Sequence, residues 1–263
     1  MNQLERLTYL IDYLKAETPR YKTLRIPEAI DEQKKVLRAM MNVRKPAPVS
    51  KEFLRIQDEY LKEEVTARGI VELSSLTPRE GTLYLWKGDM TRLAVDAIVN
   101  AANSELLGCF IPCHSCIDNA IHSFAGVSLR LLCNDLMVKQ GAPEPLGQAK
   151  ITPAYNLPAK YVIHTVGPRV GFEVTEEQKD ALSGCYRSSL ELAHQFGADS
   201  IAFCCISTGV YRFPNDLAAE IAIRTVKDFL SEHASSLKVV FNVYKDIDFR
   251  IYDELLGKSQ PRA

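Results

Sequence analysis

Apolar residues recur at helical spacing from the start of the chain. Leu4, Leu7, Ile11 and Leu14 fall three or four positions apart, which places them on one face of a helix. The pair Thr18-Pro19 ends this pattern, because a residue that precedes proline avoids the helical region of backbone space. The sequence therefore predicts an amphipathic helix that stops at this pair.

Two more helices are expected before residue 75. One starts near Pro27, which suits a first helical turn, and the next is capped by Ser50 and ends near Gly69. Their apolar positions are Ile30, Leu37 and Met40, then Phe53, Ile56 and Tyr60. Three short helices bury little apolar surface alone. We therefore expect residues 1–75 to form an N-terminal helical extension packed on the rest of the chain.

From residue 70 the pattern changes to short apolar runs separated by helical segments. Strands are expected at Ile70–Leu73, Leu83–Trp86, Ala97–Asn100, Tyr161–Thr165, Ser200–Ile206 and Lys238–Val243, and helices near 117–139, 176–196 and 215–234. Strands that alternate with helices predict an α/β domain, here residues 76–263, with a largely parallel sheet covered on both faces. Ligands of such sheets bind beyond the carboxyl ends of the strands, so the loops that follow the strands are the candidate site.

Charge and cysteine content narrow the choice of partners. The formal charge is −1 and no basic stripe is present, so neither nucleic acid nor an anionic membrane is expected as a partner. No long apolar run marks a signal peptide or a membrane span. Seven cysteines, an odd number, favour a reducing compartment over a disulfide framework. We expect a cytoplasmic protein.

Two loops after expected strands carry side chains suited to hydrogen bonding. Asp89 follows the strand that ends at Trp86, and it could accept a hydrogen bond from a ligand amine or only cap the turn. Asn100 and Asn103 stand at the end of the next strand, where amides can hold a turn and also meet a ligand. The residues alone leave both alternatives open.

A third loop joins an expected strand to a helix, with the sequence Ser207-Thr208-Gly209-Val210-Tyr211-Arg212-Phe213-Pro214. Its small residues allow successive backbone N–H groups to face one point, and a helix N-terminus adds a field that favours an anion. The loop could therefore cradle phosphate, with Tyr211 or Phe213 packed on a sugar. An ordinary strand-to-helix turn is the alternative.

The densest group of candidate ligands lies between Gly108 and Asn119. Cys109, Cys113, His114 and Cys116 fall within eight residues, and thiolates with imidazole are the ligands that zinc prefers. No second ligand pair follows far downstream, so three protein ligands with an open fourth position are favoured over a closed structural site. We assign one Zn²⁺ to Cys109, His114 and Cys116 and leave Cys113 out. A chance cluster of buried cysteines is the alternative.

The helix after this cluster carries two further candidates. Asp118 is expected to begin the helix, where its carboxylate would cap the N-terminus. His122 lies on the same helical face and is interpreted as a core histidine or as a support for the metal site. His164, inside an apolar run, is expected to be structural. No Ser-His-Asp order or Walker loop is present.

Five segments in one order resemble the macrodomain family: Gly88-Asp89, Ala97–Asn103, Asp118–His122, Tyr161–Pro168 and Ile206–Val210. Order and spacing agree over residues 81–258, whereas residues 1–75 fall outside the resemblance. It implies a three-layer α/β/α fold with a mostly parallel mixed sheet and ADP-ribose as the ligand.

The resemblance also implies roles for the candidate residues. Asp89, with its neighbour Met90, would bind the adenine end, and Asn103 would bind the distal ribose. The diphosphate would lie on Ser207, Thr208, Gly209, Val210 and Tyr211, with Phe213 in the same substrate-binding set. Arg212 departs from the family pattern, because many macrodomains have glycine there.

A second departure concerns the segment after the asparagine pair, where most hydrolytic macrodomains carry a run of glycines. The Cys and His cluster here resembles the zinc-dependent, sirtuin-linked macrodomains of bacteria and fungi, whose motif Cys-x4-His-x-Cys is matched by Cys109, His114 and Cys116. The resemblance implies zinc-dependent hydrolysis at the distal ribose C1 of mono-ADP-ribosylated protein, at a carboxylate linkage, with a functional link to a sirtuin-type ADP-ribosyltransferase. Asn103 would orient the ribose and Asp118 would position or deprotonate water.

Two other function classes compete with this interpretation. A non-catalytic ADP-ribose reader would use the same ligand contacts, and a closed structural zinc site would favour it. A zinc-stabilised nucleic-acid module is disfavoured by the near-zero net charge.

Overall fold

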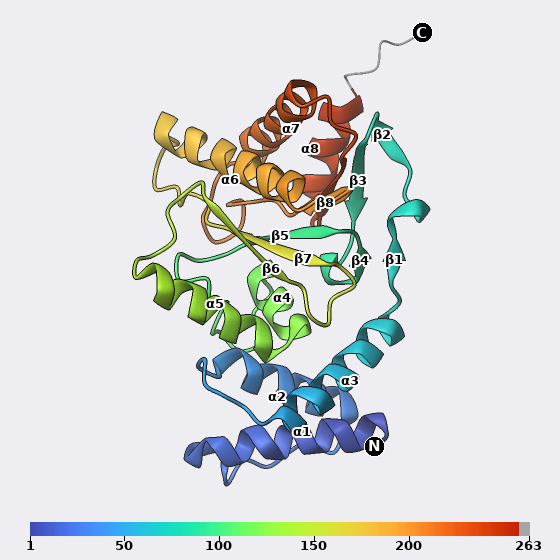
Figure 1. The fold of residues 1–263 in the computed structure, drawn as a ribbon, viewed down its shortest axis with the longest axis vertical. Coiled ribbons are helices and arrows are strands. Elements are labelled where there is room, and N and C mark those ends of the chain that lie inside the picture. Colours follow the sequence, from blue (N-terminus) through green and yellow to red (C-terminus); the bar gives the residue numbers. More distant parts are fainter. Residues whose placement is uncertain (258–263) are drawn as a thin grey trace.

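A seven-stranded sheet forms the centre of the computed structural model, which describes residues 1–257 (Figure 1). The strand order is β2 (Pro78–Glu80), β3 (Leu83–Lys87), β9 (Lys238–Val243), β8 (Ser200–Phe203), β5 (Ala97–Ala101), β7 (Tyr161–Thr165) and β6 (Ala149–Pro153). The strands from β3 to β7 in this order pair in parallel, whereas β2 and β6 pair antiparallel at the two edges. The predicted mostly parallel mixed sheet is confirmed.

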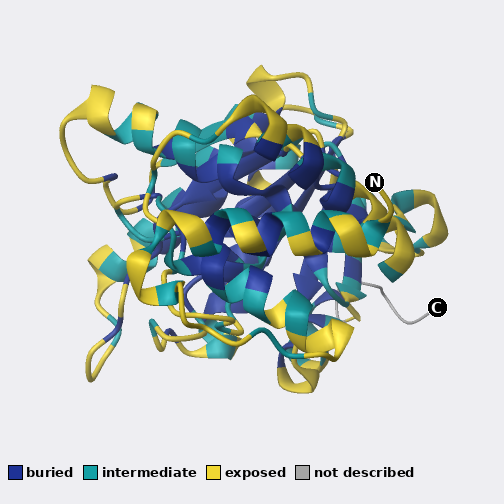
Figure 2. Ribbon diagram, turned by 90° about the horizontal axis from the view of Figure 1, so that it is seen from below, coloured by how far each residue is buried: buried dark blue, intermediate teal, exposed yellow. Residues whose placement is uncertain are grey.

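Helices cover both faces of this sheet. One layer holds α4 (Ile117–Ala125) and α5 (Val127–Gln140), and the other holds α6 (Glu176–Gln195), α7 (Asn215–Glu232) and α8 (Asp246–Gly257) (Figure 1). The central strands β5 and β8 are almost wholly buried, because both of their faces meet helices. Figure 2 shows the buried residues gathered at the centre of the molecule. The three-layer α/β/α fold is therefore confirmed.

The N-terminal helices pack beneath α4 and α5 (Figure 1). They are α1 (Gln3–Glu17), α2 (Ile30–Val43) and α3 (Lys51–Arg68), and their buried side chains form a hydrophobic cluster that also takes in Val127 of α5. Polar contacts join the two parts: Gln57 Oε1 accepts a hydrogen bond from Val127 N at 3.0 Å, and Asn156 Nδ2 donates to Asp58 Oδ1 at 2.7 Å. The domain boundary between residues 75 and 76 stays a prediction.

Several local expectations are corrected. Helix α2 begins at Ile30 rather than near Pro27, and Ile30 is 50% exposed, so it does not belong to the buried face. The single helix expected over 117–139 is two helices. Gly126 separates them with φ +95°, and a Cβ there would lie 2.5 Å from Gln57 Nε2, so packing against the N-terminal extension requires glycine at the break.

Other elements differ in extent or were missed. The strand expected at Ile70–Leu73 is only β1 (Val71–Glu72), which pairs with β4 (Leu93–Ala94) outside the main sheet. The strand expected over Ser200–Ile206 ends at Phe203. Strands β2 and β6 and helix α8 were not expected from the sequence, and neither were three short 3₁₀ helices, η1 (Pro19–Tyr21), η2 (Leu73–Ser75) and η3 (Met90–Arg92). Within residues 1–257, no helix combines the length and the apolar character needed to cross a membrane.

Candidate active site

The loops that follow β3, β5 and β8 leave the sheet at the same end, beyond the carboxyl ends of the strands, because these strands run parallel. The first loop carries Asp89, the second carries Asn103 and the cysteine cluster, and the third carries Ser207 to Phe213. The topology thus gathers the candidate residues from three distant parts of the chain at one end of the sheet.

Asp89 both caps a turn and stays accessible. Its Oδ1 accepts hydrogen bonds from the backbone N and the Oγ1 of Thr91, at 3.0 and 2.7 Å, at the start of η3. Its Oδ2 accepts a hydrogen bond from Arg68 Nη1 at 3.0 Å, and the side chain keeps 35% exposure. Met90 is different: the whole residue is only 1% exposed within the core, so it offers a ligand almost no accessible surface.

Asn103 and Asn100 together hold the carboxylate of Asp118. Asn100 Nδ2 donates to Asp118 Oδ1 at 2.8 Å, and Asn103 Nδ2 lies 3.4 Å from Asp118 Oδ2 while also donating to Gly108 O at 3.0 Å. Burial raises the pKa of Asp118 to about 6, against the opposing effect of the Asn100 hydrogen bond. Asp118 is thus a buried carboxylate tied to the residue expected to bind ribose.

The capping role expected for Asp118 is wrong. Cys116 is the N-cap residue of α4, and its Sγ accepts a hydrogen bond from the backbone N of Asn119 at 3.4 Å. Asp118 lies inside the first helical turn, where its side chain is directed at the end of β5 and bonds the two asparagines instead of the helix N-terminus.

The loop after β8 has an unusual backbone for its residue types. Ser207 and Arg212 have φ values of +65° and +59°, in the left-handed region that favours glycine. Ser207 O accepts a hydrogen bond from Phe213 N at 3.0 Å, which closes the loop just before α7 begins. The buried Ser207 Oγ has no hydrogen-bond partner among the described residues. A strained loop with an unsatisfied hydroxyl fits the phosphate-binding interpretation.

The side chains of this loop divide into accessible and buried ones. Val210 is 62% exposed, and Tyr211 is half-buried. Thr208 Oγ1 donates to Cys205 O at 3.0 Å, and Gly209 O accepts a hydrogen bond from Arg212 N. Phe213 is 1% exposed in the hydrophobic core, so it anchors the loop and is not placed to pack on a sugar. Tyr211 is the aromatic side chain that remains accessible.

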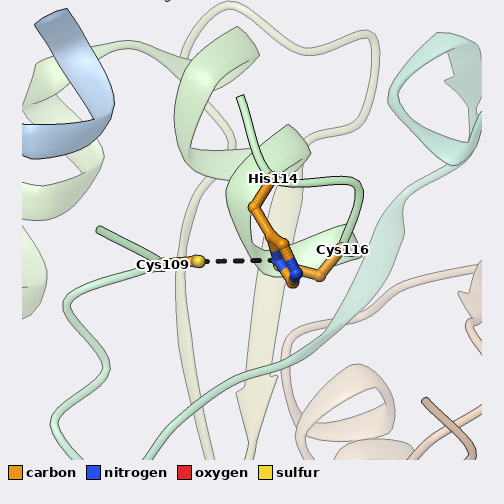
Figure 3. A group of neighbouring side chains, drawn as sticks. All are labelled: Cys109, His114 and Cys116. Carbon is orange, nitrogen blue, oxygen red and sulfur yellow. Dashed lines mark hydrogen bonds between the residues drawn. The ribbon is translucent and has the colours of Figure 1, made fainter. Parts of the chain in front are cut away.

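Cys109, His114 and Cys116 form a group that could hold a metal ion (Figure 3). Their candidate ligand atoms all lie within 4.8 Å of one another, and Cys109 Sγ is 3.7 Å from His114 Nδ1. All three residues are half-buried. Cys113 is exposed and stays outside the group, because its thiol donates to Lys35 O at 3.4 Å. The grouping agrees with the assignment made from the sequence.

Gly108 allows this segment to approach α4 closely. Its φ is +79°, and a Cβ there would lie 2.7 Å from the ring of His122. His122 is buried, with its Nε2 3.6 Å from Asp118 Oδ1 and neither ring nitrogen hydrogen-bonded to a described residue. Among the described residues it therefore packs against Gly108, next to the group Cys109, His114 and Cys116, and does not belong to that group.

A second His and Cys group, His122, Cys133 and His164, is completely buried. Burial lowers the pKa of His164 to about 4 and raises the pKa of Cys133 to about 12. His164 Nδ1 lies 3.2 Å from Asn100 Nδ2 and its Nε2 lies 3.0 Å from Thr152 Oγ1. Held by these partners in the core, His164 has a structural role, as expected from the sequence.

Four polar residues near the site were missed, and three of them belong to the N-terminal extension: Arg38, Asn42, Arg68 and Asn119. Arg68 stacks over the Phe124 ring at 3.7 Å and pairs with Asp89. Arg38 and Asn42 reach the segment that carries Cys109, His114 and Cys116, through His114 O and Cys113 N. No local pattern marks the contacts of Arg38, Asn42 and Arg68, because their partners lie far away in the chain, so the sequence carried no signal for these three residues.

Comparison with known proteins identifies relatives over nearly the whole chain. Residues 99–222 match the family model of the Macro domain. A Treponema medium protein named protein-ADP-ribose hydrolase is 53% identical, over 98% of this chain and all of that protein. A Fusarium oxysporum f. sp. cubense protein named probable bifunctional ADP-ribose hydrolase/ADP-ribosyltransferase is 40% identical, over 87% of this chain and 42% of that protein.

A solved structure supports the same assignment. The Trypanosoma brucei macrodomain in complex with ADP-ribose superposes with a TM-score of 0.66 and 32% identity, covering 83% of this chain and 95% of that one. Together with the α/β/α fold described above, this similarity and the 53% identity to the Treponema medium protein show that the chain belongs to the Macro domain family and, within it, to the enzymes named protein-ADP-ribose hydrolases.

Proposed function

We propose that this enzyme is a zinc-dependent hydrolase that removes mono-ADP-ribose from carboxylate side chains of modified proteins and releases free ADP-ribose. One observation carries the proposal. Asn103 bonds the carbonyl of Gly108, which precedes the ligand Cys109, and also contacts Asp118, which follows the ligand Cys116 by two residues. Asn103, which is expected to hold the ribose, therefore contacts residues on both sides of the segment that carries the three proposed metal ligands.

The donor set fits zinc. Two thiols and one imidazole are borderline-soft ligands, and three protein ligands are the number found in catalytic zinc sites. A bound zinc ion would supply Lewis-acid chemistry, either by polarising a substrate oxygen or by activating water. Asn103 would orient the distal ribose through its side-chain amide, and Asp118 would position water or accept its proton.

Other residues would bind the adenine and diphosphate parts of ADP-ribose. Asp89 would accept a hydrogen bond from the adenine amine, since its side chain stays partly exposed beside η3. The backbone of Ser207, Thr208, Gly209, Val210 and Tyr211 would hold the diphosphate, with the unsatisfied Ser207 hydroxyl as a further donor. The similarity to a Trypanosoma brucei macrodomain solved with ADP-ribose supports this ligand.

A reader module with a structural zinc is the second candidate. A closed Cys₃His site would need Cys113 as the fourth ligand, but the thiol of Cys113 is bonded to Lys35 O and lies outside the group. The half-buried set of three ligands therefore favours the hydrolase.

Two finer points belong to the same proposal. A functional link to an ADP-ribosyltransferase, here proposed to be of the sirtuin type, is supported by the Fusarium oxysporum relative, whose name combines hydrolase and ADP-ribosyltransferase. The cytoplasmic location is proposed from the odd cysteine count, which favours a reducing compartment.

One assay tests the proposal directly. The metal-loaded protein is incubated with proteins that carry mono-ADP-ribose on carboxylate, serine or arginine side chains, and release of ADP-ribose is followed. Release from the carboxylate substrate is expected. Binding of ADP-ribose without release from any of the three would support the reader, and release from serine or arginine alone would overturn the proposed linkage.

The adenine contact gives the first mutational prediction. Asp89→Ala is expected to weaken ADP-ribose binding by roughly 10- to 100-fold, because the ligand loses a hydrogen bond to a charged acceptor. Isothermal titration calorimetry measures it. Thr91→Val is a matched control, since it removes one partner of Asp89 Oδ1 and leaves the carboxylate in place. Equal affinity in wild type and Asp89→Ala would reduce Asp89 to a turn residue.

The proposed metal ligands give the second mutational prediction. About one zinc per chain is expected to copurify with the wild type and with Cys113→Ser, but not with Cys109→Ser or Cys116→Ser. Elemental analysis of the purified variants measures zinc content. Metal loss in Cys113→Ser combined with retention in Cys109→Ser would show that the ligand assignment is wrong.

A further inference from the structure

The segment that carries the metal ligands, Gly108–Cys116, has no regular secondary structure. We refer to it as the metal loop. A loop of this kind gains metal affinity when other parts of the protein fix its ligands in place beforehand, because less conformational entropy is then lost on binding. Side chains of helix α2 in the N-terminal extension contact this loop directly.

Arg38 of α2 reaches the backbone of a ligand residue. Its Nη2 donates hydrogen bonds to His114 O at 3.2 Å and to Asn119 Oδ1 at 2.7 Å. Its Nε also donates to Asn119 Oδ1, at 3.2 Å. The guanidinium is planar and rigid, so these bonds fix His114 and Asn119 relative to each other.

Asn119 extends this contact to the other two ligands. Its Nδ2 donates to Ile111 O at 2.9 Å and lies within 3.4 Å of Cys109 O, and its backbone N–H donates to Cys116 Sγ at 3.4 Å. Each of the three ligand residues is therefore hydrogen-bonded either to Arg38 or to Asn119, its partner.

Asn42 fixes the loop at a second point. Asn42 Oδ1 accepts a hydrogen bond from Cys113 N at 2.9 Å, where Cys113 has φ +51°, a strained value for a residue other than glycine. Its Nδ2 donates to Ser123 Oγ at 2.8 Å, and the side chain is 1% exposed. The end of α2 is held in turn by Arg130, whose Nη1 donates to Met41 O and Asn42 O at 2.9 Å each.

We propose that Arg38 and Asn42 are positioning residues that hold the metal loop in its ligand-presenting arrangement, so that zinc affinity depends on the N-terminal helical extension. The inference rests on the proposed zinc function. It gives the extension a role at the active site, although residues 1–75 lie outside the segment matched by the Macro domain family model.

The test compares zinc affinity among full-length variants by competition with a chromophoric chelator. Arg38→Ala and Asn42→Ala are each expected to weaken zinc binding on the order of 10- to 100-fold, the range found when groups that support metal ligands are removed. Lys34→Ala is the matched control, because Lys34 lies on the same helix and pairs with Glu64 of α3, within the extension. Its zinc affinity should stay within about twofold of wild type, the small difference expected when a partly exposed ion pair away from the metal loop is removed.

Two conservative variants separate positioning from general stability. Asn42→Asp keeps the acceptor for Cys113 N–H and should restore most of the affinity lost in Asn42→Ala. Arg38→Lys keeps the charge, but one ammonium cannot reproduce the fork that joins His114 O to Asn119, so its affinity should stay low. With Co²⁺ in place of zinc, the thiolate-to-metal absorption bands should change in Arg38→Lys and stay unchanged in Lys34→Ala.

The outcomes are distinguishable. Tight zinc binding by wild type and equal affinity in Arg38→Lys and Asn42→Ala would overturn the positioning role and leave the proposed hydrolase intact. An equal loss in Lys34→Ala would also overturn it, since any loosening of the extension would then suffice. A wild type that binds no zinc would overturn both proposals.

Discussion

Treating the metal-loaded protein with a strong chelator is expected to abolish hydrolysis while leaving the fold and most of the ADP-ribose affinity intact. The sheet core does not depend on the metal loop, because none of its buried hydrophobic residues comes from Gly108–Cys116. A domain with a core of this size folds without a metal ion, unlike a small zinc finger. The rate loss should be on the order of 10³ or more, because several kcal/mol of transition-state stabilisation disappear.

Binding should persist because the contacts at the other end of the ligand are separate from the metal loop. Asp89 precedes η3 as its N-cap residue and Ser207 lies in the loop after β8, and neither makes a hydrogen bond to Cys109, His114 or Cys116. Circular dichroism, calorimetry with ADP-ribose and the release assay are run on one chelated sample and repeated after zinc is restored. Unchanged turnover in verified metal-free protein would refute zinc dependence, whereas global unfolding would make the site structural.

The sheet was largely predictable from sequence because its strands are buried on both faces. Such strands appear as continuous apolar runs, and Ala97–Ala101 and Lys238–Val243 were located within one residue. The edge strands β2 and β6 were missed for the converse reason. Their residues are mostly exposed or half-buried, so Pro78–Glu80 and Ala149–Pro153 have no such apolar run.

In the candidate site, groupings of residues close in sequence were predictable, whereas side-chain directions and contacts between distant residues were not. Cys109, His114 and Cys116 are close in sequence, and their grouping in space agrees with the assignment. The roles of Asp118 and Phe213 depended on where their side chains point, which spacing does not encode. Asp118 bonds Asn100 across to β5, and Phe213 enters the core. Arg38 and Asn42 contact residues that lie 71 to 81 positions further along the chain, so these contacts could be found only from the structure.

Asp118→Asn is expected to lower the rate of ADP-ribose release by roughly 10²- to 10⁴-fold, the usual contribution of a general acid or base. The carboxylate is buried and hydrogen-bonded to Asn100 at 2.8 Å and lies 3.4 Å from Asn103 Nδ2, so it is fixed beside the residue proposed to hold the ribose. An asparagine of nearly the same shape keeps the acceptor for Asn100 but cannot take up a proton. Single-turnover kinetics on the carboxylate-linked substrate measures the loss.

Asp118→Asn removes the proton acceptor and also the oxygen that faces Asn103 Nδ2, so zinc content and ADP-ribose affinity are measured together with the rate. Zinc content and ADP-ribose affinity of Asp118→Asn should match the wild type, because Asp118 is neither one of the three ligand residues nor part of the adenine and diphosphate contacts. Asp58→Asn is the matched control: Asp58 accepts a hydrogen bond from Asn156 at the contact between α3 and the main domain, and its loss should leave turnover unchanged. If Asp118→Asn turns over at the wild-type rate with full metal content, Asp118 only holds Asn100 and Asn103 in place, and another group must activate water.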